Sequence, residues 1–442
     1  MLLCQLTRVC LPRESRERSC IEKMDWSYRT ISRKTDRWAG WAAVALGFSI
    51  PISTALDEIL LVLILALWLA GDRFRVKITA VRDNPIVLPA LLLFGMYIVG
   101  LLYGEASGRE AMGALSKAAN LLFIPILLFF FREERVRSSA LSGFLAALAL
   151  TILISYLLWM GVMPPSRLFH ITPDDAYTPF KHRITHSFLM AFGAYLFALK
   201  SRLEPGRPRR ILFAVLSAAA LANVLFMVSG RTGYVVVLVL GLYFLIGGWR
   251  WRGAAAAAAV LVLLSGTIYL MPASVPHQRI ELMADELMKW QPGRPEATSV
   301  GYRLEYYLNS LKLIGERPLL GAGTGGFKGA YAALVKGTGM DPSDNPHNEY
   351  LMVTVQLGFA GLALMLWLFL VQWRKAALLP GGFERSAARG LVLLILSASM
   401  VTSTLIDHTE GLIYVWMSAL LFAGWSSAGS GECSEPCRYP SS

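Results

Sequence analysis

The sequence predicts an all-α membrane protein with about twelve membrane-spanning helices and one large external loop. Three observations favour this class. Of the 442 residues, 55% are hydrophobic and only 16% are charged, and the mean hydropathy is +0.50. Apolar runs recur along most of the chain, many of them near the ~20 residues that a helix needs to cross a bilayer. A single long polar stretch, residues 271–350, interrupts these runs.

Twelve apolar segments come close to the length that a bilayer requires, and the shorter ones could tilt or lie partly buried in the bundle. The predicted spans are Trp38–Ser53, Ala55–Ala70, Pro85–Tyr103, Ala118–Phe131, Ser138–Met160, Ser187–Leu199, Ile211–Val228, Gly233–Gly248, Ala254–Leu270, Leu351–Trp373, Ala388–Ile406 and Leu412–Ser426. The predicted organisation is therefore a tail of residues 1–37, nine spans in residues 38–270, the large loop of residues 271–350, three spans in residues 351–426, and a disordered tail of residues 427–442.

Lysine and arginine are concentrated in alternate connections, including the N-terminal tail and the loops near Arg75, Arg135, Arg207 and Arg374. Positive residues mark the cytoplasmic side of membrane proteins, so both termini are predicted to be cytoplasmic and the large loop external. We interpret the net charge of +12 as a topology signal rather than a nucleic-acid footprint. The polar first 37 residues contain no apolar segment typical of a cleavable signal. All five cysteines lie in the two tails, where they cannot crosslink the core.

The segment Ser229–Tyr234 reads SGRTGY and places Arg231 in a glycine-flanked external turn between two spans. An arginine near the bilayer is costly unless it has a partner, and the glycines permit close approach of a ligand to the backbone. Arg231 is therefore a candidate anion-binding residue. The alternative is that its side chain reaches out to lipid headgroups.

The segment Lys181–His186 reads KHRITH and precedes the sixth predicted span. We interpret Arg183 as a second candidate anion contact. His182 and His186, four residues apart, could bind a metal on a helix, but no acidic or cysteine ligand is close in sequence, so they are more typical of interfacial residues.

The large loop contains a predicted helix from Tyr302 to Ile314, in which Leu304, Leu308 and Leu311 share one face. Another face carries Arg303, Tyr306, Tyr307 and Ser310. The loop ends in Pro346-His347-Asn348-Glu349-Tyr350, which places His347 at a helix start on the membrane surface. The glycine-rich run at residues 321–326 lacks the Gly-Lys-Ser/Thr ending of a phosphate-binding loop, so we interpret it as a turn. The acidic residues lack the clustering of a Mg²⁺ site, and no cofactor is expected.

With these motifs, the chain resembles the O-antigen ligase family, within the wider group that includes O-antigen polymerases and protein O-oligosaccharyltransferases. The resemblance covers about residues 38–426. It rests on the twelve predicted spans, the loop before the tenth span, SGRTGY, the stretch GYRLEYY to ERPLLGAGTGGF, and PHNEYL followed by QLGFAGL.

The resemblance implies a GT-C-like glycosyltransferase in the bacterial inner membrane, with its site on the periplasmic face. Such an enzyme moves O-antigen polysaccharide from undecaprenyl diphosphate to a sugar hydroxyl of lipid A-core, with inversion and without a metal. Its partners would be these two lipids and the bilayer, with no nucleic acid. We expect His347 to be the base, Arg231 and Arg303 to hold the diphosphate, and Arg183, Tyr306, Tyr307 and Asn348 to contact the donor or the acceptor.

Two kinds of alternative remain open at this stage. An O-antigen polymerase, or less closely a protein O-glycosylation enzyme, would share the donor chemistry. A transporter or flippase of lipid-linked glycans would also be polytopic with external arginines, but it should show ionisable residues within its spans or paired broken helices. The sequence shows few ionisable residues within the spans.

Overall fold

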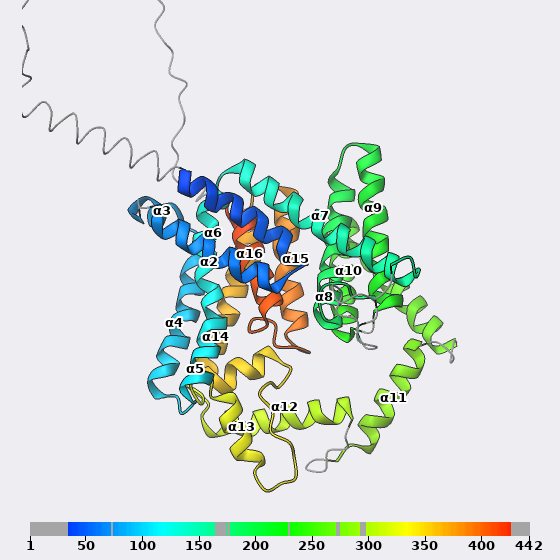
Figure 1. Ribbon diagram of the computed structural model, residues 1–442. Helices are drawn as coiled ribbons and strands as arrows, with labels where there is room; N and C mark the ends of the chain where they lie inside the picture. Colours follow the sequence, from blue (N-terminus) through cyan, green and yellow to red (C-terminus); the bar gives the residue numbers. More distant parts are fainter. Residues whose placement is uncertain are drawn as a thin grey trace, which may run out of the picture.

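The computed structural model describes residues 34–71, 74–163, 175, 177–228, 230–270, 275–291 and 298–425. Most of the two predicted tails, and residues 271–274 and 292–297 of the large loop, lie outside this part of the chain. Its regular elements are all helices (Figure 1). After a first helix over residues 34–49 they are α2 (Thr54–Ala70), α3 (Phe74–Val81), α4 (Val87–Tyr103), α5 (Gly108–Ala118), α6 (Phe123–Phe131), α7 (Glu134–Trp159), α8 (Arg183–Leu203), α9 (Arg207–Ala222), α10 (Arg231–Leu270), α11 (Val275–Lys289), α12 (Ser299–Glu316), α13 (Phe327–Val335), α14 (Glu349–Ala376), α15 (Gly382–Ala398) and α16 (His408–Phe422).

The predicted all-α membrane character is confirmed. Among the described residues, four helical stretches are long and apolar enough to cross a bilayer: residues 108–131, α7, residues 207–227 and α14. The pair α2 and α3, bent by 116°, could form a fifth. Shorter apolar helices are α4 and residues 231–247. A total of twelve spans therefore remains a prediction.

The eighth and ninth predicted spans lie within one continuous helical element, α10, of 40 residues. This element is not straight. A Cβ on Gly253 would collide with the carbonyl oxygen of Leu245, whereas residues eight apart in a straight helix are separated by about 12 Å. The chain therefore turns back sharply near the boundary that the sequence predicts.

One predicted span is too long. Ala388–Ile406 was expected to be helical throughout, but α15 ends at Ala398, and residues 399–407 form an irregular connection to α16. Hydroxyl side chains explain the difference, because serine and threonine compete with helical hydrogen bonds through local bonds of their own. Here the hydroxyls of Ser399 and Thr404 are 2.6 Å apart, and Ser403 bonds outside its own segment.

Helix packing forms a bundle in which α8 contacts α9, α10 and α15, while α14 lies against α4 and α16 against α6. Trp416 lies in the core between the rings of Phe131 and Phe144, and its Nε1 donates a 3.0 Å hydrogen bond to the carbonyl of Ala43. The described parts of the large loop, α11 to α13, gather at one end of the bundle (Figure 1). A second apolar cluster joins this loop to α14 through Leu313, Tyr331 and Met352.

The glycine-rich turn at residues 321–326 docks into a break in α14. Gly358 has φ +64°, outside the helical region, and this break exposes backbone groups. The carbonyls of Val355 and Gln356 each accept a 2.8 Å bond from the amides of Ala322 and Gly323. In return, Phe359 N donates to the carbonyl of Pro318 at 2.8 Å. The predicted turn is confirmed, and these bonds fix the loop on the helix that follows His347.

Candidate active site

His347 occupies a tight turn just before α14. Its φ of +53° lies in the left-handed region, which is uncommon for a residue with a side chain. Two contacts hold this conformation. The amide of His347 donates to Oδ1 of Asn345 at 2.8 Å, and the same oxygen accepts a 2.7 Å bond from the hydroxyl of Ser403. The turn is therefore fixed from the connection between α15 and α16.

The connection between α15 and α16, residues 399–407, supports the histidine turn at further points. The carbonyl of Met400 accepts hydrogen bonds from the Tyr307 hydroxyl at 2.8 Å and from Asn348 Nδ2 at 3.2 Å. The amide of Glu349 donates to Ser399 O, and Oε2 of the buried Glu349 accepts from the amide of Leu405. The two segments are therefore joined through both backbone and side chains.

α12 brings an arginine and two tyrosines to the histidine. The ring of Tyr306 lies 6.2 Å from that of His347, and the Tyr307 hydroxyl is 3.5 Å from the His347 carbonyl. Arg303, one turn earlier on α12, is close enough to act on the His347 charge. Burial lowers the pKa of His347, the positive charge of Arg303 lowers it further, and Asp344 partly opposes both effects. The imidazole is therefore biased towards its neutral form.

Arg231 is close enough to Arg303 to act on its charge, although 72 residues separate them in the sequence. Burial lowers the pKa of Arg303, and the positive charge of Arg231 acts in the same direction. Two guanidinium groups within electrostatic reach of each other repel, and an anion bound between them would remove this repulsion. Arg231 begins α10 with an exposed side chain, so it is accessible to a ligand.

Arg183 lies at the start of α8, against the turn that carries Arg231. A Cβ on Gly230 would collide with the Arg183 carbonyl and with Ser187, so only glycine allows this close approach. The Arg183 amide donates to Asp175 Oδ1 at 2.8 Å. The structure therefore brings the backbones of the two predicted anion-binding segments together.

The alternative of a metal between His182 and His186 is not supported by their contacts. His186 is buried, and its Nε2 is 2.9 Å from Oδ1 of Asn223, whereas His182 Nε2 faces Asp175 at 3.5 Å. The two rings thus serve different partners. Across the described part of the chain, no three His, Cys, Asp or Glu side chains are grouped closely enough to hold a metal ion.

Two predicted ligand-binding residues already have partners within the protein. Asn348 caps α14 through Oδ1, which accepts from Leu351 N at 3.1 Å, and its Nδ2 is bonded to Met400. The Tyr307 hydroxyl is bonded to the same carbonyl. These contacts favour a positioning role, whereas the ring of Tyr306 lies beside His347 itself.

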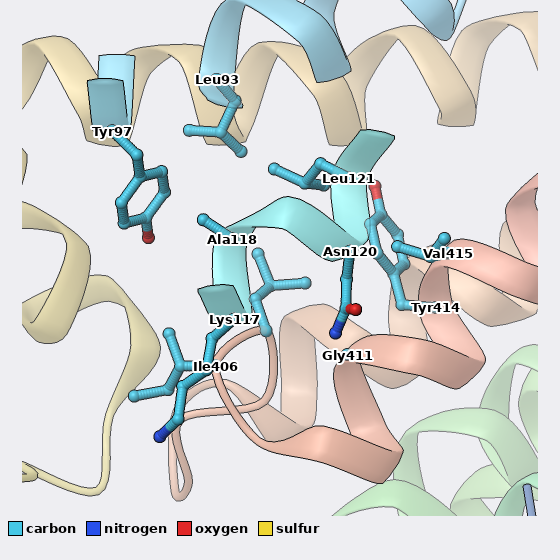
Figure 2. A pocket seen from close by; sticks show the side chains of 11 residues that line it. Leu93, Tyr97, Lys117, Ala118, Asn120, Leu121, Ile406, Gly411, Tyr414 and Val415 are labelled. Carbon is cyan, nitrogen blue, oxygen red and sulfur yellow. The ribbon is translucent and has the colours of Figure 1, made fainter. Parts of the chain in front are cut away.

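Sequence reasoning missed a lysine that acts on the connection between α15 and α16. Lys117 lies at the edge of a pocket lined mainly by apolar side chains from α4, η1 (Ala119–Leu122) and α16 (Figure 2). Burial raises the pKa of Asp407, and Lys117 opposes this increase. Lys117 lies 290 residues from Asp407 in the sequence, and nothing in its sequence surroundings indicated this contact.

A second missed cluster joins α2 to the segment before α8. The buried side chain of Asp57 lies 3.6 Å from Lys181 Nζ and 3.5 Å from His408 Nε2. The other ring nitrogen of His408 lies 3.2 Å from Glu58. The adjacent acidic pair at residues 57 and 58, in an otherwise apolar helix, was the available signal.

Comparison with known proteins identifies one family. Residues 212–366 match the family model described as O-antigen ligase. The matched segment extends from α9 into α14 and contains Arg231, Arg303 and His347. No curated protein matches the chain.

Proposed function

We propose that this protein, whose residues 212–366 belong to the O-antigen ligase family, transfers O-antigen polysaccharide from undecaprenyl diphosphate to a sugar hydroxyl of lipid A-core. The family match supports a transferase of the ligase or polymerase type in lipopolysaccharide biosynthesis. One observation carries the finer proposal. Arg231, Arg303 and His347 come from three separate parts of the chain, and Arg303 lies within electrostatic reach of each of the other two.

In the proposed reaction, His347 removes the proton of the acceptor hydroxyl as that oxygen attacks the anomeric carbon. The new bond between oxygen and the anomeric carbon forms as the bond to the diphosphate oxygen breaks. The diphosphate leaves with the electron pair, and the sugar is inverted. A neutral imidazole is the form that can accept the proton, and a positioned base typically contributes about 10²–10⁴-fold to the rate.

Arg231 and Arg303 would stabilise the negative charge that develops on the leaving diphosphate. Guanidinium groups suit this role because they stay charged and can form paired hydrogen bonds to phosphate oxygens. Preorganised cations at a site of developing charge account for much of enzyme catalysis. Arg183 would assist from the start of α8, and the Tyr306 ring would contact the sugar or the diphosphate beside His347.

The proposed setting is the bacterial inner membrane, with both termini cytoplasmic and the site on the periplasmic face. Both lipid substrates keep their chains in the bilayer, so the site would open between helices at that surface. The donor already contains the reactive diphosphate bond, and no nucleotide is needed.

The test is transfer by the purified protein in detergent. It would be given an undecaprenyl-diphosphate-linked glycan and lipid A-core, in the presence of EDTA. We expect wild-type transfer, a loss of at least about 10²-fold in His347→Ala, and a comparable loss in Arg303→Gln. Arg317→Gln is the matched control, because Arg317 follows α12 in the same loop and pairs with Glu105 at 2.8 Å.

Each contrary outcome has a specific meaning. Near wild-type transfer by Arg303→Gln or Arg231→Gln would contradict the diphosphate assignment. Chain growth on the undecaprenyl donor, with no product on lipid A-core, would identify a polymerase. Loss of wild-type activity in EDTA, restored by a divalent cation, would refute the metal-independent mechanism.

A further inference from the structure

Two helices carry exposed apolar stripes that meet at one end. On α4, exposed residues recur at helical spacing from Leu88 through Leu92 and Ile98 to Leu102, which is 83% exposed. On α14, Phe359, Leu366 and Leu370 form a similar stripe. Stripes of this kind on packed helices of a membrane protein face the hydrocarbon of the bilayer. The two helices pack against each other, so the stripes lie on neighbouring helices.

The turn Pro318–Leu320, directly after α12, extends these stripes. Leu319 is 73% exposed and Leu320 48%. The turn is joined to both stripes, because Tyr103 at the end of α4 donates to the Leu320 carbonyl and the amide of Phe359 donates to the Pro318 carbonyl. The two exposed leucines therefore lie between the ends of the lipid-facing stripes, although they belong to a polar loop.

The carbonyls of this turn are hydrogen-bonded within the protein and do not depend on water. Non-helical backbone is tolerated at membrane depth only where the protein satisfies its polar groups. All three carbonyls from Pro318 to Leu320 accept hydrogen bonds, from Phe359 N, from Ala360 N and from the Tyr103 hydroxyl. A turn exposed to water would not need these bonds, since water would supply them.

A charged pair borders the apolar turn. Arg317, the residue before Pro318, pairs with Glu105 just beyond the end of α4, and both side chains are largely exposed. Charged residues next to apolar surface are typical of the boundary between hydrocarbon and headgroups.

We propose that Leu319 and Leu320 are inserted into the acyl-chain region of the leaflet that faces the large loop, where they anchor the C-terminal end of α12 to the bilayer. The occupant of this surface is bilayer lipid. In the sequence, the two leucines lie between Arg303 on α12 and His347. Their insertion would therefore fix the height of the C-terminal end of α12 above the membrane. This inference does not depend on the reaction that the protein catalyses.

The test uses an environment-sensitive label. All five cysteines lie at residues 4–20 and 433–437, outside the described residues, so replacing them with serine gives a background for single cysteines. Leu319→Cys would be labelled with NBD in the full-length protein and reconstituted into phosphatidylcholine–phosphatidylglycerol liposomes. Quenching would be measured with lipids carrying nitroxides at chosen acyl depths, and with aqueous iodide.

Two matched positions calibrate the result. Leu102→Cys reports the exposed end of α4, and Lys336→Cys reports the exposed polar end of α13 in the same loop. We expect position 319 to be quenched by acyl-chain nitroxides as strongly as position 102, and severalfold less by iodide than position 336. Iodide quenching equal to that at position 336 would overturn the proposal. Protection from both quenchers would also overturn it, because it would show that protein covers the turn.

Discussion

Replacing Tyr307 with phenylalanine separates two roles for this residue. Its hydroxyl donates to Met400 O at 2.8 Å and lies 3.5 Å from His347 O. If the hydroxyl positions the histidine turn, Tyr307→Phe should lower kcat and leave KM for the lipid-linked donor unchanged. If the hydroxyl binds the diphosphate directly, KM for the donor should rise.

The size of the effect follows from the contacts. A typical hydrogen bond contributes about 0.5–1.5 kcal/mol net, and an orphaned buried acceptor costs more. Met400 O is not orphaned in the variant, because Asn348 Nδ2 remains 3.2 Å away. We therefore expect a cost of about 1 kcal/mol. If all of it is transmitted to the transition state, transfer should fall about fivefold.

The assay is initial-rate transfer at varied donor concentration. Tyr156→Phe is the matched control, because the Tyr156 hydroxyl also donates to a backbone carbonyl, that of Ala219 at 3.0 Å, but within the helical bundle. The free energy of this hydrogen bond should affect the stability of the bundle and hardly reach the transition state of transfer. The kcat of Tyr156→Phe should therefore stay within about twofold of wild type. Equal losses of kcat in the two variants, or no loss in Tyr307→Phe, would refute the positioning role.

Two further predictions concern the charge and the backbone of the site. Arg303 depresses the pKa of His347, so Arg303→Gln should raise that pKa; the base would then become protonated, and inactive, at a higher pH than in wild type. Asp344→Asn should shift the pKa in the opposite direction, and an NMR titration of labelled histidine would detect either shift or, by showing none, contradict the electrostatic argument. Gly323 has φ +86° and lies against Gly104, where a Cβ would overlap the Cα of that residue. Gly323→Ala therefore adds this overlap to the ~1 kcal/mol strain of a left-handed residue. It should lower the thermal midpoint of unfolding by more than that strain alone would. Gly329→Ala, with open space around its Cβ and a better helix former, should be neutral or slightly stabilising; equal midpoints for the two variants would show that the turn is not clamped.

Periodicity and composition were sufficient to predict the helical class and the helix that contains Arg303. Tyr302–Ile314 lies within α12 as expected. The spacing of leucines did not reveal which face is buried, however. Asn309 and Ser310 are buried, whereas Leu311 is 56% exposed. In a membrane protein an exposed leucine can face lipid, so an apolar stripe does not by itself identify the protein core.

The candidate site was predicted as residue types, but its assembly could not be. Histidine and arginine were recognised because their chemistry fits an anionic leaving group and a proton acceptor. Met400 and Leu405 make their contacts through backbone atoms, whose positions depend on where α15 ends. Such contacts cannot be predicted from the identity of the side chains. Similarly, the glycine-rich run indicated a turn, but nothing near Gly358 indicated that α14 would break and receive it.

The exchange of backbone bonds between this turn and α14 bears on how the protein is made. A broken helix that enters the bilayer alone would carry unpaired carbonyls and amides, each costing several kcal/mol in hydrocarbon. Residues 318–323, which satisfy these groups, precede the break at Gly358 in the chain. During synthesis from the N-terminus, this segment is therefore already translated when α14 leaves the ribosome. Its backbone groups can then pair with those at the break in α14 as the helix inserts. The reverse order would expose an unsatisfied segment to the insertion machinery.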